Sequence, residues 1–300
     1  MLPAVIALVT LGLSLVSGEV VKRESGQKQL VALAHTGEPE KARHNSAIQT
    51  SDVKTAPKGQ TGRSVALVIG NAAYPDAGLP LAQPLNNARA VAAALKDKGF
   101  DVQLGENLTK QAMEQAFETF KSKIQPGSTA LIFFSGFGIQ ASRQTYMVPI
   151  NAQIWSDGDV RRSGLSVEPL LSEIDAKGAG AKIVILDASR RNPFERRFRS
   201  VSGGLGAIHA PDDTLVMYSA APGKVVSDGD SDLSPLLSEL IGQIRDSGHS
   251  GEAVFNRTRR AVSRASQGEH VPWVSSSLVQ DFSFAAPASD ELARTQQGAR

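Results

Sequence analysis

The sequence predicts an α/β fold: three layers, α/β/α, around a mostly parallel β-sheet. Short, continuously apolar runs occur along the chain, as expected for strands that are covered on both faces. These runs alternate with segments whose apolar residues recur at helical spacing, and that alternation is typical of parallel sheets. The chain has 300 residues, 41% of them hydrophobic, which is enough for one sizeable core with tails.

Local patterns define each expected element. The apolar run 64–70 indicates the first core strand. The first helix stops at Gly99, a residue type frequent at helix ends, and the second runs from Thr109 to a stop at Pro126-Gly127. In order, the expected strands are 64–70, 100–104, 128–134, 146–149, 181–186 and 214–218. The first helix spans 87–98, and the helices after the second are expected at 167–177, 233–245 and 251–267.

Both ends of the chain differ from this pattern. Residues 1–18 carry no charged side chain and end in small residues, which is typical of a secretory signal peptide. We therefore expect export to the periplasm, with membrane attachment only if this leader stays uncleaved. Residues 19–62 are polar and rich in helix breakers and are expected to be a disordered linker, and residues 285–300 a frayed tail.

Composition excludes several classes of function. The chain has no cysteine, so it can form no disulfide, thiolate metal site or cysteine nucleophile. Its formal charge of +2 is too balanced to indicate nucleic acid as the main partner. Gly136-Phe-Gly138 lacks the third glycine and the helix of a dinucleotide fingerprint, so no nucleotide cofactor is expected.

Two expected strands end in motifs that carry a resemblance. Residues 131–140 read Leu-Ile-Phe-Phe-Ser-Gly-Phe-Gly-Ile-Gln, and residues 185–194 read Ile-Leu-Asp-Ala-Ser-Arg-Arg-Asn-Pro-Phe. They resemble the Ser-Gly-His-Gly and Asp-Ala-Cys-Arg motifs of caspase-like peptidases, in the metacaspase and bacterial orthocaspase branch. Phe137 then stands at the position of the family's histidine and Ser189 at that of its cysteine, separated by roughly the 50 residues known for that pair.

The resemblance covers nearly the whole chain beyond the linker and implies one caspase-like domain, with p20-like and p10-like parts, over residues 63–284. Further segments resemble the same pattern in order: 66–71 with Tyr74, 146–149, 218–223 with 227–229, and 271–273 with 275–278.

The same resemblance implies a pseudopeptidase. Phe137 cannot accept a proton, and a serine hydroxyl needs a strong adjacent base. The alternative is a working hydrolase in which Ser189 is the nucleophile and His209, in a loop expected near the crevice, is its base.

Binding could survive without catalysis. By resemblance, Asp187 and Asp228 form an acidic pocket for a Lys or Arg side chain, and the backbone N–H groups of Gly138 and Ser189 occupy the oxyanion positions. The competing interpretation is that Asp187 ties its loop together through backbone amides. The partners expected are a basic peptide segment or an active caspase-like relative.

Two charged segments remain. Asp228, Asp230, Asp232 and Glu239 have the spacing of a calcium loop, but Leu233 replaces its glycine and Pro235 interrupts it, which favours a solvated turn over calcium. The second segment is expected to be a solvated basic loop that proteases cleave, and it contains Arg190, Arg191, Arg196, Arg197 and Arg199.

Overall fold

The computed structural model describes residues 62–78, 80–195, 204–227, 229–246 and 248–285. All of them belong to the second of the two units into which the chain divides, residues 53–300. The expected leader, most of the expected linker, Asp228 and the tail from residue 286 lie outside the described residues.

The elements alternate as the sequence predicts. The strands are β1 (Ser64–Gly70), β2 (Asp101–Glu106), β3 (Thr129–Ser135), β4 (Gly138–Ala141), β5 (Gln144–Met147), β6 (Leu165–Ser166), β7 (Ala181–Asp187), β8 (Thr214–Tyr218) and β9 (Trp273–Ser276). The helices are α1 (Pro84–Asp97), α2 (Lys110–Ser122), α3 (Asp157–Ser163), α4 (Val167–Ala176), α5 (Pro235–Arg245) and α6 (Gly251–Ala265).

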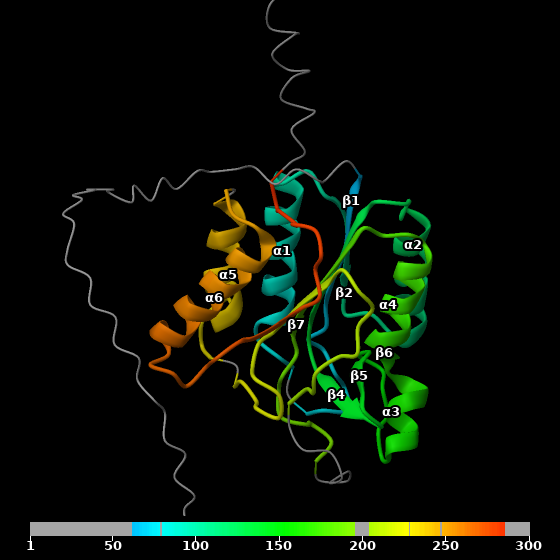
Figure 1. Cartoon of the computed structure of the whole chain (residues 1–300). Helices are drawn as coiled ribbons and strands as arrows, with labels where there is room; N and C mark the ends of the chain where they lie inside the picture. The colour runs from blue at the N-terminus through cyan, green and yellow to red at the C-terminus, as the bar shows by residue number, and fades with distance from the viewer. Residues whose placement is uncertain (1–61, 79, 196–203, 228, 247, 286–300) are drawn as a thin grey trace, which may run out of the picture. The chain divides into compact units, whose positions relative to one another are not determined.

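A six-stranded sheet forms the middle layer, with the strand order β2-β1-β3-β7-β8-β9. The first five strands of this order pair in parallel, and β9 pairs antiparallel to β8. Helices α1, α5 and α6 cover one face and α2 and α4 the other (Figure 1). The predicted three-layer fold with a mostly parallel sheet is therefore confirmed.

The alternation within β1 shows how sequence leads to these layers. Val65, Leu67 and Ile69 pack with the apolar residues of α2 and α4, whereas Ala66 and Val68 pack with those of α1, α5 and α6. Each buried Val, Leu or Ile side chain stabilises the fold by roughly 1.5–3 kcal/mol.

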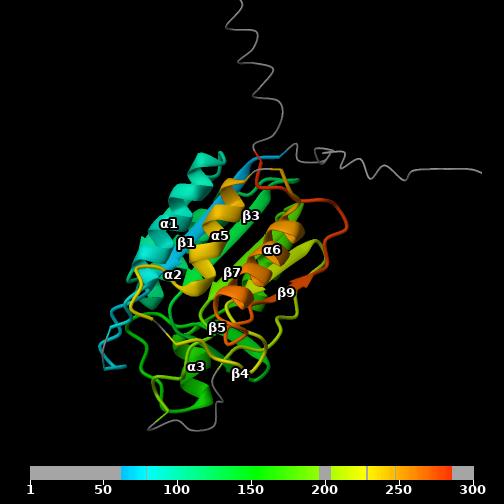
Figure 2. The ribbon, with the colours of Figure 1, turned by 90° about the vertical axis from the view of Figure 1, so that its left-hand side faces the viewer.

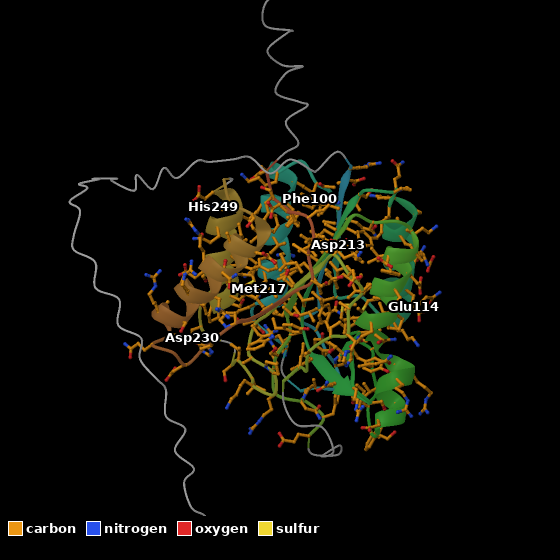
Figure 3. All side chains as sticks on the ribbon, viewed as in Figure 1. Phe100, Glu114, Asp213, Met217, Asp230 and His249 are labelled. Carbon is orange, nitrogen blue, oxygen red and sulfur yellow. The ribbon has the colours of Figure 1, made fainter. Side chains whose placement is uncertain are left out.

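Most apolar side chains lie in the interior, and most charged side chains of the helices lie on their outer sides. Met217 of β8 is fully buried, and Figure 3 shows it inside the molecule, with Glu114 on the outer side of α2.

A small antiparallel sheet, β4-β5-β6, lies next to α3 at the lower end of the molecule in Figure 1. It begins directly after β3, so it lies at the carboxyl ends of the parallel strands. Its apolar residues pack into a third core cluster, to which Tyr74 and Phe137 belong. Such an edge is where α/β proteins place their ligand crevice.

The sequence missed β4, α3 and β6, which are short, and did not assign β9 as a strand. The first helix begins at Pro84 instead of Asn87, because Pro84 takes an early helical position where its missing N–H costs nothing. The second helix starts at Thr109 as predicted, and the structure shows that Thr109 caps it: its hydroxyl accepts a hydrogen bond from the Ala112 N–H at 3.3 Å. None of the described helices combines the length and apolar composition needed to cross a membrane.

Candidate functional site

Phe137 and Ser189 emerge side by side at the carboxyl edge of the sheet. Strands β3 and β7 are parallel neighbours, and their register pairs Ser135 with Asp187. Each candidate residue lies two positions beyond one of these residues. The backbone stays joined past the strand ends, since the Gly138 N–H donates to the Ala188 carbonyl at 3.1 Å. The structure thus brings the two predicted site positions together.

Phe137 is part of a packed aromatic pair. Its side chain is 7% exposed, and its ring lies 4.8 Å from the ring of Tyr74, tilted by 60°. The Phe137 N–H donates to the Tyr74 hydroxyl at 3.1 Å, and this hydroxyl donates to the Val148 carbonyl at 3.1 Å. Burial raises the pKa of Tyr74 well above its usual range, so the phenol stays protonated. The position that the sequence resemblance assigns to a base therefore holds an apolar ring packed against Tyr74.

The Ser189 hydroxyl is shut inside the protein. Ser189 is 1% exposed, and its Oγ is buried without a hydrogen-bond partner among the described residues. The backbone of Val226 lies against Ser189: the Val226 N–H donates to the Ser189 carbonyl at 2.7 Å. An alcohol in this position has neither an acceptor for its proton nor access to a substrate carbonyl.

His209 does not act on Ser189 in this structure. The imidazole is exposed, and its charge acts on Glu168, where it opposes the rise in pKa that burial causes. The structure therefore gives no support to the alternative of a Ser189/His209 pair.

The expected oxyanion donors are also occupied by the protein. The Gly138 N–H donates to the Ala188 carbonyl, and the Ser189 N–H donates to the Ser219 hydroxyl at 3.2 Å. Neither group points to an open position in which an oxyanion could form.

Asp187 is buried and held by side chains. It is 2% exposed, and its Oδ2 accepts hydrogen bonds from Asn87 Nδ2 at 2.8 Å and from Ser135 Oγ at 2.9 Å. Arg190 Nη2 lies 3.4 Å from the same oxygen. Neither sequence interpretation describes this arrangement. The basic group at Asp187 comes from the chain itself, and the donors to its carboxylate are side chains rather than backbone amides.

Arg190 corrects a further expectation. It was predicted to lie in a solvated basic loop, yet its side chain is 6% exposed, and its Nη1 donates to the Gly136 carbonyl at 3.0 Å and to the Asp187 carbonyl. The attraction of the Asp187 carboxylate offsets the desolvation cost of burying this guanidinium. Arg191 is 82% exposed, as predicted, and Arg196, Arg197 and Arg199 lie outside the described residues.

The sequence did not predict that two amide side chains, Gln83 at the N-cap of α1 and Asn87 within α1, hold the segment 229–234. Asn87 Oδ1 accepts from the Ser234 N–H at 3.0 Å, so Asn87 joins this segment to Asp187. Gln83 Nε2 lies 3.2 Å from the Gly229 carbonyl, 3.0 Å from the Ser231 carbonyl and 3.3 Å from the Leu233 carbonyl. Nothing local in the sequence signals contacts between residues this far apart in the chain.

These contacts also involve the segment whose acidic residues have the spacing of a calcium loop. The segment's carbonyl oxygens face the Gln83 amide, and the Asp230 and Asp232 side chains are exposed. Within the described residues, no three His, Cys, Asp or Glu side chains come together as a metal site. Asp228 itself lies outside those residues.

A cavity of about 400 Å³ adjoins Phe137. Its charged lining residues are both arginines, and no carboxylate contributes to it. The lining consists of Leu81, Phe137, Arg190, Arg191, Val225, Val226 and Ser227. The described edge of the site is therefore apolar and basic rather than acidic.

Comparison with known proteins agrees with this architecture. A search among curated proteins found no match to the chain. The caspase domain model of the peptidase C14 family matches residues 63–283, which is most of the chain. This match and the helix-covered parallel sheet, with its two motifs at neighbouring strand ends, show that the chain belongs to the peptidase C14 caspase-domain family.

Proposed function

We propose that this protein is a catalytically silent member of the metacaspase and orthocaspase branch, exported by a bacterium, which acts by binding polypeptide or by regulating an active relative. The observation that carries this proposal is the state of Ser189. Its hydroxyl is buried without an acceptor, and the neighbouring base position holds Phe137 packed on Tyr74.

The size of the catalytic loss supports the same proposal. Removing one member of a catalytic unit in a hydrolase costs on the order of a million-fold in kcat. Here both positions of the pair differ from the family pattern, and the two expected oxyanion donors are bound to Ala188 and Ser219. No remaining group of the described site supplies a nucleophile with a base.

A basic peptide segment is one proposed partner, and its binding at Asp187 requires that Arg190 move away. A Lys or Arg side chain reaches Asp187 only if it displaces Arg190, whose guanidinium already lies against that carboxylate. Pairing with an active relative carries no such condition, because it can use any outer surface.

Hydrolysis by the full chain tests the proposal. Fluorogenic peptides that end in Arg, Lys or Asp are offered to the wild type, with and without calcium, and to Ser189→Ala. We expect no cleavage by either protein. Cleavage by the wild type that Ser189→Ala abolishes would overturn the proposal and establish a serine hydrolase.

The Phe137→His, Ser189→Cys double variant serves as the matched comparison. Cleavage after basic residues by this variant, beside a silent wild type, would mean that the two replacements alone silence the site. A silent double variant would mean that the burial of position 189 and the pairing of Arg190 with Asp187 also keep substrate out.

A further inference from the structure

Two hollows adjoin each other on the side of the molecule formed by α6 and β9, which lie side by side in Figure 2. The first, of about 340 Å³, lies between the segment 220–226 and the turn 268–271 that follows α6. The second, of about 470 Å³, lies along α6, and Val271 lines both. Val225 and Val226 separate the first hollow from the cavity beside Phe137.

The charged side chains around these two hollows are mostly cationic. Their lining includes four cationic side chains and the single carboxylate of Glu269. Among the residues that the structure describes, none of the four cations forms an ion pair, unlike Arg89 with Glu106 or Lys121 with Glu173. We name the four, together with Val271, the arginine face: Lys224, Arg259, Arg260, Arg264 and Val271.

Apolar groups lie exposed beside these cations. Val225, 44% exposed, and Val271, 41% exposed, both line the first hollow, and Trp273, 41% exposed, follows Val271 by two residues at the start of β9. They are three of the six large apolar side chains exposed in the described part of the chain. Exposed apolar side chains gathered at one place, with arginines around them, are typical of protein interaction sites.

An unsatisfied polar atom lies at the same place. His270 lines the first hollow, and its Nδ1 is buried without a hydrogen-bond partner in the described structure. A buried polar atom without a partner is unfavourable, so this atom marks a place where the surface lacks a hydrogen-bonding group.

We propose that the arginine face docks an acidic segment of a partner protein. Carboxylates of the segment bind the guanidinium groups of Arg260 and Arg264, since charge-assisted, bidentate pairs are strong and directional. An apolar side chain between those carboxylates enters the hollow beside Val271. The inference rests on the proposed function only in that the chain acts by binding.

Charge complementarity and shape favour protein over nucleic acid. A nucleic-acid surface needs a basic stripe that follows a row of phosphates and is usually part of a strongly basic domain. This chain carries a formal charge of only +2, and the first hollow has Ala220, Val225 and Val271 in its walls. Apolar walls fit a side chain flanked by acidic residues.

Fluorescence anisotropy with the full chain tests the proposal. The probe is a short labelled peptide in which glutamates flank leucines, and the comparison peptide has lysine in place of every glutamate. We expect the acidic peptide to bind, more weakly at high salt, and the lysine peptide not to bind. The Arg260→Glu, Arg264→Glu variant should weaken binding roughly tenfold or more, because like charges then face each other.

Arg257→Glu is the matched control. Arg257 lies on the same helix, 43% exposed, but lines neither hollow, and its Nη1 is 3.9 Å from Asp246 Oδ2. This variant should change affinity by less than about twofold, since single exposed charges contribute little. Val271→Asp is a second, independent variant, which should weaken binding by blocking the apolar hollow with a like charge.

Three results would overturn the proposal: no binding of the acidic peptide, equal losses in the Arg257 and Arg260/Arg264 variants, or stronger binding of a single-stranded oligonucleotide than of the peptide. Because the assay measures no cleavage, it fails or succeeds apart from the proposed function. A wild type that hydrolyses peptides and still binds would overturn only the proposed silence. A silent wild type that does not bind would overturn only this inference.

Discussion

Arg190 and Asp187 form an ion pair inside the protein, with Arg190 Nη2 3.4 Å from Asp187 Oδ2 and both side chains at most 6% exposed. Asp187 ends β7, and Arg190 turns back to it from three residues further along the chain. The chain's own arginine thus lies where the resemblance to caspase-like peptidases suggests a basic side chain of a substrate. The Asp187 carboxylate is therefore already paired with a cation when no partner is bound.

Arg190→Ala should strongly destabilise the protein. Removing one partner of a buried ion pair leaves an uncompensated charge and typically costs about 3–5 kcal/mol. Urea denaturation followed by circular dichroism measures this loss in the free energy of unfolding. Ethylguanidinium should recover part of it, because this cation can occupy the space that the side chain leaves beside Asp187.

Arg191→Ala provides the comparison for Arg190. Its guanidinium is 82% exposed and pairs with Glu195 at 3.4 Å, so its loss should cost less than about 1 kcal/mol. Equal losses in the two variants would show that the buried pair does not stabilise the fold. A destabilised Arg190→Ala that ethylguanidinium does not help would mean that the space beside Asp187 closes.

The layers of the fold could be predicted from sequence because they depend on local patterns. Apolar runs such as 64–70 indicate strands buried on both faces, and their alternation with amphipathic helices favours a sheet between two helical layers. The sequence also predicted that Phe137 and Ser189 border one crevice, since each follows the end of an expected strand. The structure adds that these two strands are neighbours in the sheet.

The fate of the polar groups could not be predicted, because it depends on contacts between distant parts of the chain. Asn87 and Ser234 are separated by 147 positions, yet one hydrogen bond joins them. Arg190 shows the same limit: within a run of arginines its charge suggests solvent, whereas the packed structure aligns it with Asp187. Short elements such as β6, with two residues, hold no periodic pattern at all.

Ser189→Ala should leave stability unchanged or raise it by up to about 1 kcal/mol. The hydroxyl is buried and unpaired in the described structure, so removing it removes a desolvation cost without breaking a bond. Thermal and urea unfolding measure the change. A clear destabilisation would show that the hydroxyl has a partner on which the site depends.

Ser135→Ala is the matched change at the end of the neighbouring strand. Its hydroxyl donates to Asp187 Oδ2 at 2.9 Å and is as deeply buried as that of Ser189. Losing a hydrogen bond to a buried carboxylate should cost about 1–3 kcal/mol. Ser135 pairs with Asp187 across the two strands, and Ser189 lies two residues beyond Asp187. Ser135→Ala should therefore destabilise the protein, whereas Ser189→Ala should not.

Glu168 should give stability a pH dependence of unusual sign for a carboxylate. Both of its oxygens accept from the Thr145 N–H, at 3.0 and 3.1 Å, yet burial outweighs these bonds and raises the pKa of Glu168 above its usual 4.5. The charge of His209 opposes this rise, and Tyr218, whose pKa is about 12, does not titrate in the same range.

A raised folded-state pKa means that the folded protein holds this proton longer than the unfolded chain. The stability contributed by Glu168 is therefore fully present below pH 4.5 and is lost as the pH rises through the folded-state pKa. Asp101 and Glu106, whose pKa values are lowered by Lys123 and Arg89, act in the opposite sense, so the total curve does not isolate Glu168.

Comparison of the wild type with the Glu168→Gln variant isolates the contribution of Glu168 to the pH dependence of stability. The amide oxygen still accepts from Thr145, and the amide does not titrate, so the wild type should lose stability relative to the variant between weakly acidic and neutral pH. Urea midpoints measured across that range, with circular dichroism as the signal, give the difference. Glu173→Gln, on the exposed side of the same helix and paired with Lys121, should shift stability by less than about 1 kcal/mol. If the difference between wild type and Glu168→Gln grows in the wild type's favour as the pH rises, the hydrogen bonds outweigh burial and the assigned direction is wrong.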